Sequence, residues 1–351
     1  MATIPNSQNF PQFSQADIIS EMKKVSNIDI SDFRFYPAIQ NRPNEIIKIE
    51  SEENGIVLTF GTVARKALLS YTHETSLHLY KPADATVDTL YLHINIWTDD
   101  IFRVVFSKEK KISNPFSGLP ENARMLIAKP EKVEFTLDET ENKITLTTSK
   151  TEITVDKKTT RISAKFIDGK EFYSQKKQDF RTGDIHDLAL ADSDNDYACF
   201  EALELESDEI IYGLGERFDS LTRNGRTVDF HNKDAVGTTS RRAYINIPFY
   251  LSTKGYGLFL NSGAKTDWQI ATTDLSALQF AVLDSQLDYF VIGGKTPKDI
   301  IKGYCSLTGF SKLPPLWSFG LWMSRNSYVS WDVVDDIAKK ANYDTWCFGH
   351  F

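Results

Sequence analysis

The sequence predicts a mainly β fold, an antiparallel β-sandwich, followed by one β/α unit near the C-terminus. Short runs of alternating apolar and polar residues, separated by turn residues, recur through the first two hundred positions, which is typical of a sandwich. Well-signalled helical patterns begin only after position 295, and the aromatic run Trp317–Met323, which follows Pro314–Pro315, has the length of a strand.

The alternation is clearest in segment 90–97, where Leu and Ile alternate with Tyr, His, Asn and Trp, so that a strand here has two different faces. The stretch 175–196 is polar and rich in Asp, which predicts a long surface loop. Further strands are expected at 56–60, 101–106, 133–137, 144–146, 153–155 and 162–166, with hairpin or strand-entry turns at Asn54–Gly55 and Asp168–Gly169.

Capping residues mark two helices. Thr296 as N-cap, Pro297 at the first helical position and Gly309 just past the end predict a helix that bridges the sandwich and the following unit. Ser330 as N-cap and Lys339–Lys340 in the last turn predict a second helix after the aromatic strand.

Composition excludes several functional classes. The net charge of −8 without a dense Lys/Arg block argues against nucleic acid or an anionic membrane as partner. No run approaches the roughly 18 apolar residues of a membrane helix, and positions 1–15 do not resemble a signal peptide, so a cytoplasmic protein is expected. Cys199, Cys305 and Cys347 lie far apart, unlike metal or redox spacings, so no cofactor is expected.

An ordered set of motifs occupies the chain from position 211 onward. The motifs are Ile-Tyr-Gly-Leu-Gly-Glu-Arg-Phe at 211–218, Asn224–Gly225, 230–234, 243–250, 255–259, 289–292, Thr296–Pro297, 313–315 and 317–322. The set resembles glycoside hydrolase family 31, which contains α-glucosidases, α-xylosidases and related retaining enzymes, with 317–322 marking entry into the barrel. The resemblance is weak from 90 to 211 and strong after it, and the residues around Asn224–Gly225 and Asn232–Asp234 are most similar to α-xylosidases.

The resemblance implies a domain plan. It places a supersandwich of the galactose mutarotase-like type over 1–295, a bridging helix and linker over 296–312, and the start of a (β/α)8 barrel over 313–351. A complete barrel needs roughly 250 residues, so the barrel is incomplete in this chain. The segment 341–351 departs from the family pattern, and a truncated or frame-shifted product is expected.

The resemblance also implies which chemical groups the reaction requires. Retaining glycoside hydrolysis uses two carboxyl groups about 5 to 5.5 Å apart, one as nucleophile and one as general acid and base. In the family both are Asp residues on later barrel strands, and neither position exists in this sequence. No catalytic residue is therefore assigned, and the chain is expected to be inactive alone.

Three residues are predicted to contact substrate through the resemblance. Asp234 matches a sandwich-loop residue that hydrogen-bonds a sugar hydroxyl, and Ser327 and Tyr328 lie where relatives place an aromatic wall of the pocket. The alternatives are a solvated surface carboxylate for Asp234 and an ordinary exposed strand end for Tyr328. His231 beside Asp234 supplies too few ligands for a metal site, so none is assigned.

The Gly-Leu-Gly-Glu-Arg run has two interpretations. Glu216 and Arg217 could be an acid/base and its partner, but after a Gly-x-Gly turn the favoured role is to fix the loop that carries Asp234. Tyr212-Gly-Leu-Gly is not a nucleotide-binding loop, because it lacks a third Gly, a Lys-Ser/Thr pair and a helix start.

The expected partner is a small-molecule carbohydrate substrate, with a homo-oligomer possible. Two other functions remain open at this point: a non-catalytic carbohydrate-binding sandwich, and an oligomerisation or docking module. An aromatic-lined groove on a sheet face would favour the first, and a mass above that of one chain in solution would favour the second.

Overall fold

The computed structural model describes most of the chain between residues 39 and 340. The chain divides into two compact units, with the boundary between Thr308 and Gly309. The predicted domain boundaries at 295 and 312 stay predictions. The residues described are 39–68, 79–114, 116, 124–130, 132–176, 188–193, 196–230, 243–320, 322 and 327–340.

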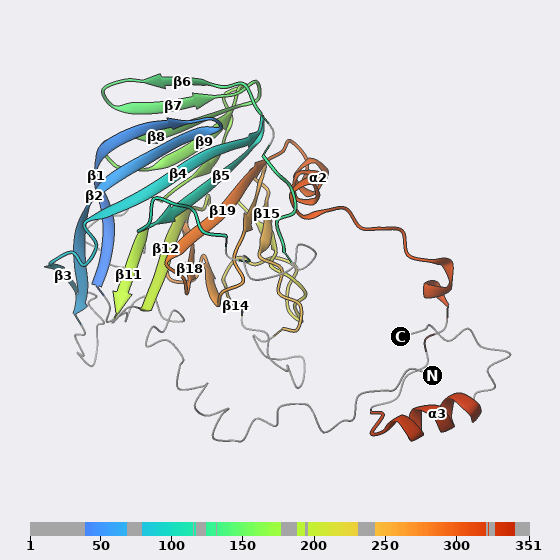
Figure 1. Cartoon of the computed structure of the whole chain (residues 1–351). Coiled ribbons are helices and arrows are strands. Elements are labelled where there is room, and N and C mark those ends of the chain that lie inside the picture. The colour runs from blue at the N-terminus through green and yellow to red at the C-terminus, as the bar shows by residue number, and fades with distance from the viewer. Residues whose placement is uncertain are drawn as a thin grey trace. The chain divides into compact units, whose positions relative to one another are not determined.

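The first unit contains two antiparallel sheets (Figure 1). In spatial order the 14-stranded sheet consists of β13 (Ile211–Gly213), β15 (Phe249–Ser252), β16 (Tyr256–Leu260), β19 (Gln286–Gly293), β5 (Ile101–Ser107), β4 (Thr89–Thr98), β2 (Gly55–Leu68), β1 (Ile39–Glu52), β11 (Ala189–Ser193), β12 (Asp196–Glu204), β18 (Ala277–Val282), β17 (Thr266–Ile270) and β14 (Arg226–Phe230), with β3 (Leu79–Ala83) beside β2. The 5-stranded sheet consists of β10 (Glu171–Ser174), β9 (Ile162–Phe166), β8 (Thr151–Asp156), β7 (Lys143–Thr147) and β6 (Thr136–Glu139).

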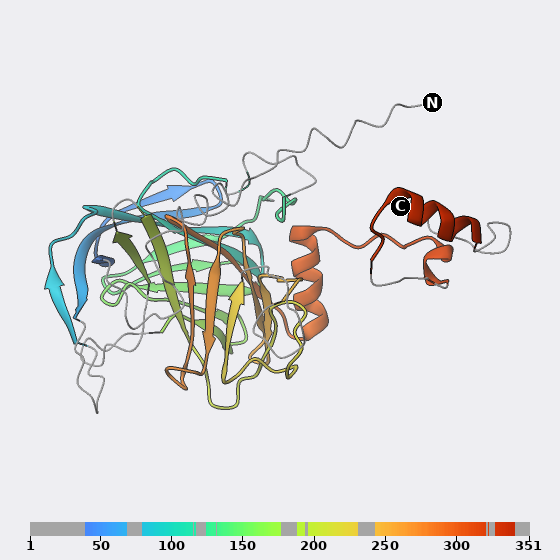
Figure 2. The same ribbon diagram turned by 90° about the horizontal axis from the view of Figure 1, so that it is seen from below.

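The two sheets share one hydrophobic core, which confirms the predicted sandwich. Figures 1 and 2 show the green strands of the smaller sheet against the blue and cyan strands β1, β2, β4 and β5. On β4, Leu90, Leu92 and Ile94 are fully buried, as the alternation predicts. Each such side chain contributes roughly 1.5–3 kcal/mol through removal from water. Across the core, the rings of Phe102 and Tyr173 meet edge to face at 5.6 Å.

A polar network also joins the sheets. The hydroxyls of Tyr173 on β10 and Tyr289 on β19 lie 2.7 Å apart, and Tyr289 donates to Glu201 Oε2 at 3.0 Å. Gln175 Nε2 donates to the same carboxylate oxygen at 2.7 Å, and the Ala202 amide donates to the other oxygen at 2.9 Å. All these side chains are buried, so the network satisfies polar groups that burial would otherwise leave costly.

The predicted loop over 175–196 is wrong for part of its length. Residues 189–193 form β11, which lies between β1 and β12 inside the larger sheet, and Leu190 is fully buried. Ala189-Leu190-Ala191 is too short a run to signal a strand among Asp residues. Pairing with strands on both sides stabilises it, because tertiary context overrides weak local propensity. Residues 177–187 lie outside the described part of the chain.

The helix predicted after Thr296 is confirmed as α2 (Pro297–Thr308), and its bridging role stays a prediction. The Asp299 amide donates to Thr296 Oγ1 at 3.3 Å and the Thr296 amide donates to Asp299 Oδ2 at 3.0 Å, a reciprocal capping box. Gly309 ends the helix at φ 101°. Ile300 and Leu307 are buried in a second cluster that lines the other face of the larger sheet, together with Phe290 and Ile292.

The second unit holds a short 3-10 helix, Leu316–Phe319, and α3 (Trp331–Lys340). The strand predicted over Trp317–Met323 is wrong, because Ser318 and Gly320 instead donate to the carbonyls of Pro315 and Trp317 at 3.0 Å each. In the described residues the backbone of this segment pairs locally. Helix α3 starts after Ser330, as predicted, with the Val333 amide donating to Ser330 Oγ at 3.4 Å. None of the described helices is long and apolar enough to span a bilayer.

Candidate functional site

Asp234, the predicted sugar-binding residue of the sandwich, lies in segment 231–242, outside the described residues. Both flanks of this segment are described. Phe230 ends β14, where it pairs with Thr266 on β17, and Ala243 is buried with 1% exposure. The site can therefore be built from the scaffold that holds the two ends of the Asp234 segment.

The turn after β13 contacts the second flank directly. Gly213, Leu214 and Gly215 have positive φ angles of 113°, 61° and 85°. This reverses the chain so that the Glu216 amide donates to the Ile245 carbonyl at 3.0 Å. A Cβ on residue 215 would lie 2.2 Å from that carbonyl oxygen, so the close approach requires glycine.

Arg217 connects both flanks. Its Nε donates to the Leu214 carbonyl at 3.2 Å and its terminal nitrogen donates to Asn246 Oδ1. The guanidinium carbon lies 5.4 Å from the centre of the Phe230 ring, within cation-π range. Burial, with a smaller contribution from Arg223, lowers the pKa of Arg217 to about 10, so the side chain stays charged at neutral pH.

A second arginine fixes the loop that follows the turn. Arg223 is 4% exposed, and its Nε donates to the Gly213 carbonyl at 2.8 Å. Its Nη1 donates to the Ser220 carbonyl at 2.8 Å and pairs with Asp219 at 2.5 Å. Five donors in a rigid fork suit arginine to this role. Both arginines thus donate hydrogen bonds to backbone carbonyls of this turn and loop, as the loop-fixing interpretation predicts for Arg217. The Glu216 side chain is exposed.

Asn224–Gly225 completes the scaffold. Asn224 Oδ1 accepts from the Ile211 amide at 2.9 Å, and its Nδ2 donates to the Glu209 carbonyl at 2.8 Å. Gly225 follows at φ 74°, at the entry to β14. Arg223 and Asn246 carry much of this scaffold but were missed by sequence reasoning. The only signal for Arg223 was its place four residues after Asp219.

Ser327 and Tyr328 lie in irregular backbone just before α3, in the second unit, and both are exposed. Tyr328 exposes 44% of its surface. Asp234 belongs to the first unit and these two residues to the second. Their convergence on one sugar stays a prediction.

Metal binding finds no support in the described part of the chain. There, no three His, Cys, Asp or Glu side chains come together in a way that could hold an ion. His231, considered with Asp234 as a ligand, lies in the segment that the structure leaves undescribed.

Relatives agree with the architecture. Alpha-xylosidase XylQ of Lactiplantibacillus pentosus is 47% identical over 126 residues, and an alpha-xylosidase of Emericella nidulans is 44% identical over 124 residues. These matches cover 36% and 35% of this chain and 16% of each enzyme, so the chain matches about a sixth of the length of these relatives.

A solved structure shows the same fold. The cycloalternan-forming enzyme from Listeria monocytogenes superposes with a TM-score of 0.65 at 22% identity, covering 88% of this chain and 26% of that one. The model of the glycosyl hydrolase 31 N-terminal galactose mutarotase-like domain matches residues 91–268, about half of the chain. The chain therefore belongs to glycoside hydrolase family 31, and its sandwich is the N-terminal galactose mutarotase-like domain of that family.

Proposed function

We propose that this chain is the N-terminal part of a retaining glycoside hydrolase of the α-xylosidase type, acting on α-linked xylosyl oligosaccharides. The observation that carries the proposal is 47% and 44% identity to two alpha-xylosidases over more than a third of the chain. The runner-up specificity, α-glucosidase, follows from the same family resemblance.

Within this function the first unit has a positioning role. Arg217, Phe230 and Asn246 hold the flanks of the segment that carries Asp234. The role proposed for Asp234 is to accept a hydrogen bond from a sugar hydroxyl. Tyr328 is proposed as an aromatic wall, since the apolar face of a sugar ring packs well on an aromatic ring.

The 351 residues are proposed to bind and position sugar without hydrolysing it. The catalytic carboxylate pair that the family places on later barrel strands has no counterpart at a matched position here, and loss of a nucleophile removes several orders of magnitude in rate. One carboxylate open to water contributes roughly 1 kcal/mol net. Sugar affinity is therefore expected in the millimolar range and nearly independent of Asp234.

The test measures release of p-nitrophenol from aryl α-xyloside and aryl α-glucoside by the purified chain, beside a mock purification and an Asp234→Ala variant. The expected rate equals that of the mock sample with both substrates. Turnover above that level which survives in Asp234→Ala would sink the proposal of inactivity. Faster turnover of the glucoside than of the xyloside would move the specificity to α-glucosidase.

A second role, self-association through the second unit, is favoured by its exposed aromatics. Phe319, Trp322 and Trp331 expose 71%, 58% and 75% of their surface, and the described part of α3 has no buried residue. Large apolar side chains left in water favour association with another surface.

A further inference from the structure

A cleft of about 760 Å³ opens in the first unit between α2 and the turns at one end of the sandwich. This size lies within the range of small-molecule sites. Its floor is apolar: Ile101, Phe166 and Ile292 line it and are at most 7% exposed. The lining residues that the structure describes do not include Ser327 or Tyr328.

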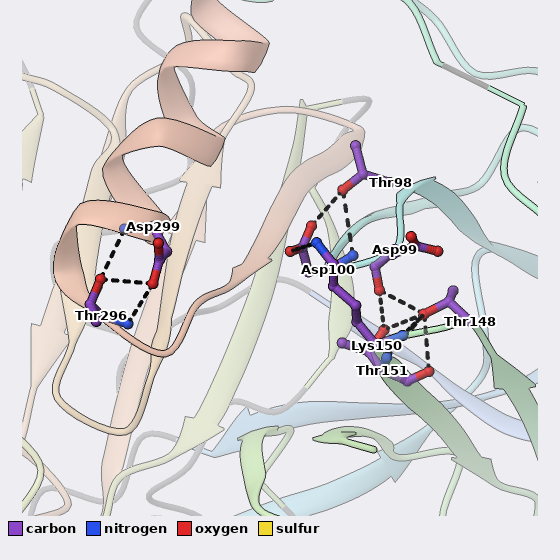
Figure 3. A network of polar contacts seen from close by, with 8 residues as sticks. All are labelled: Thr98, Asp99, Asp100, Thr148, Lys150, Thr151, Thr296 and Asp299. Atoms are coloured by element: carbon purple, nitrogen blue, oxygen red, sulfur yellow. Dashed lines mark hydrogen bonds and ion pairs between the residues drawn. The ribbon is translucent and has the colours of Figure 1, made fainter. Parts of the chain in front are cut away.

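One wall is a single side of α2. Asp299, Lys302 and Ser306 line the cleft, and their spacing of three and four residues places them on one face of the helix. The capping box holds Asp299, because Thr296 Oγ1 donates to Asp299 Oδ2 at 2.7 Å (Figure 3). This wall is therefore fixed before any ligand arrives.

A second wall is the turn that carries Lys150. Lys150 Nζ pairs with Asp100 at 2.7 Å. The hydroxyls of Thr148 and Thr151 donate to the Asp99 carbonyl at 2.6 and 2.9 Å, which joins the two sheets at this point (Figure 3). The hydrogen bond with Asp100 raises the pKa of Lys150, and Asp299 across the cleft adds a smaller effect in the same direction.

A third wall pairs Asp168 with Lys295 at 3.1 Å. The cleft thus carries three carboxylates and three ammonium groups, with Lys302 lacking any partner among the residues that the structure describes. The formal charges cancel. An anion would meet three carboxylates, and a cation would meet three ammonium groups. A hydroxyl group can instead donate a hydrogen bond to a carboxylate and accept one from an ammonium group.

We propose that this cleft binds a neutral, hydroxyl-rich ligand, such as one or two units of an oligosaccharide, with the apolar floor against the carbon face of a sugar ring. Hydroxyls would accept from Lys302 and donate to carboxylate oxygens of the walls. The described residues that line the cleft include none of the three predicted substrate contacts, so the proposal goes beyond the proposed function and is tested separately from it.

The experiment uses the full 351-residue chain and maltotriose as probe, detected by saturation-transfer NMR. Ser306→Trp fills the cleft from the helix, and Lys302→Ala removes its unpaired donor. The matched controls are Ile301→Trp and Lys298→Ala, at positions of the same helix that do not line the cleft. Thermal melting confirms that each variant folds. If Ser306→Trp does not fold, Lys302→Ala against Lys298→Ala carries the comparison.

The expected result is saturation transfer to maltotriose in the wild type, lost in Ser306→Trp and weakened about tenfold in affinity in Lys302→Ala, the factor for one hydrogen bond to a charged group. Both controls and Asp234→Asn keep the wild-type signal. The proposal is overturned by no signal in the wild type, by equal loss in cleft and control variants, or by loss in Asp234→Asn. A different outcome is that the wild type broadens the phosphorus NMR signal of inorganic phosphate and that Lys302→Ala abolishes this broadening. That result would assign the cleft to anions instead.

Discussion

Glu201 is a carboxyl group buried between the two sheets, with 1% of its surface exposed. Burial raises its pKa to about 7, against the opposing effect of hydrogen bonds from Ala202, Gln175 and Tyr289. Burial also raises the pKa of Tyr173 and Tyr289 well above the usual value, so their hydroxyls stay protonated and able to donate. The inter-sheet network therefore contains one group that titrates near neutrality.

Its titration predicts a pH dependence of stability. The carboxyl has a higher pKa folded than unfolded, so its contribution is fully present below about pH 4.5 and is lost as pH rises through 7, by at most about 3 kcal/mol. Glu201→Gln cannot ionise. Urea unfolding at pH 5 and pH 8 should show a smaller loss in the variant than in the wild type. Identical losses in both proteins would contradict the assignment.

Arg217 makes a residue-scale prediction about the scaffold of the Asp234 segment. Arg217→Lys keeps the charge but cannot donate to Leu214 and Asn246 at once, because an ammonium lacks the planar fork. We expect a loss of about 2 kcal/mol in the free energy of unfolding, measured by urea titration. Arg226→Lys, at an exposed position of β14, is the control. Equal effects of the two substitutions would show that Arg217 does not hold the flanks.

At the scale of elements, the turn after β13 depends on Gly215. Gly215→Ala combines an unfavourable φ of 85° with a Cβ 2.2 Å from the Ile245 oxygen, so a loss of more than about 3 kcal/mol is expected. Gly225→Ala has a similar φ of 74° but open space around the Cβ, and should cost about 1 kcal/mol. Chemical denaturation of both variants separates the cost of the Cβ collision from the cost of the positive φ angle. Equal losses of stability in the two variants would contradict a contribution from the collision with the Ile245 oxygen.

The sequence predicted those elements that neighbouring residues specify. The alternation in β4 and the caps of α2 are written in neighbouring residues, and both elements formed as predicted. β11 and the 3-10 turn at Leu316–Phe319 depend on which strands lie beside them, and sequence alone does not show that. The same limit applies to the site. The Gly-Leu-Gly turn can be predicted from its own residues, whereas Asn246 acts through a hydrogen bond from Arg217, which lies 29 positions away in the sequence.

For the whole molecule, the two units predict separable behaviour. A chain ending at Lys312 keeps α2 and all the strands that the structure describes, so its thermal transition should match that of the full chain. The full chain should gain mass with concentration in light scattering, because Phe319 and Trp331 expose most of their surface, and the shorter chain should not. A full chain that stays a monomer at all concentrations, and loses everything after Lys312 at once to protease, would contradict the self-association role.

The end of α2 determines how the sandwich responds to force. The Leu307 carbonyl accepts from the amides of both Ile127 and Ala128, at 3.0 and 3.1 Å, while the Leu307 side chain is buried. Tension on the chain beyond Gly309 would therefore act on two hydrogen bonds and one buried side chain at the same time. Because one residue makes all these contacts, we expect the last turn of the helix and segment 125–128 to detach from the sheet as one cooperative unit.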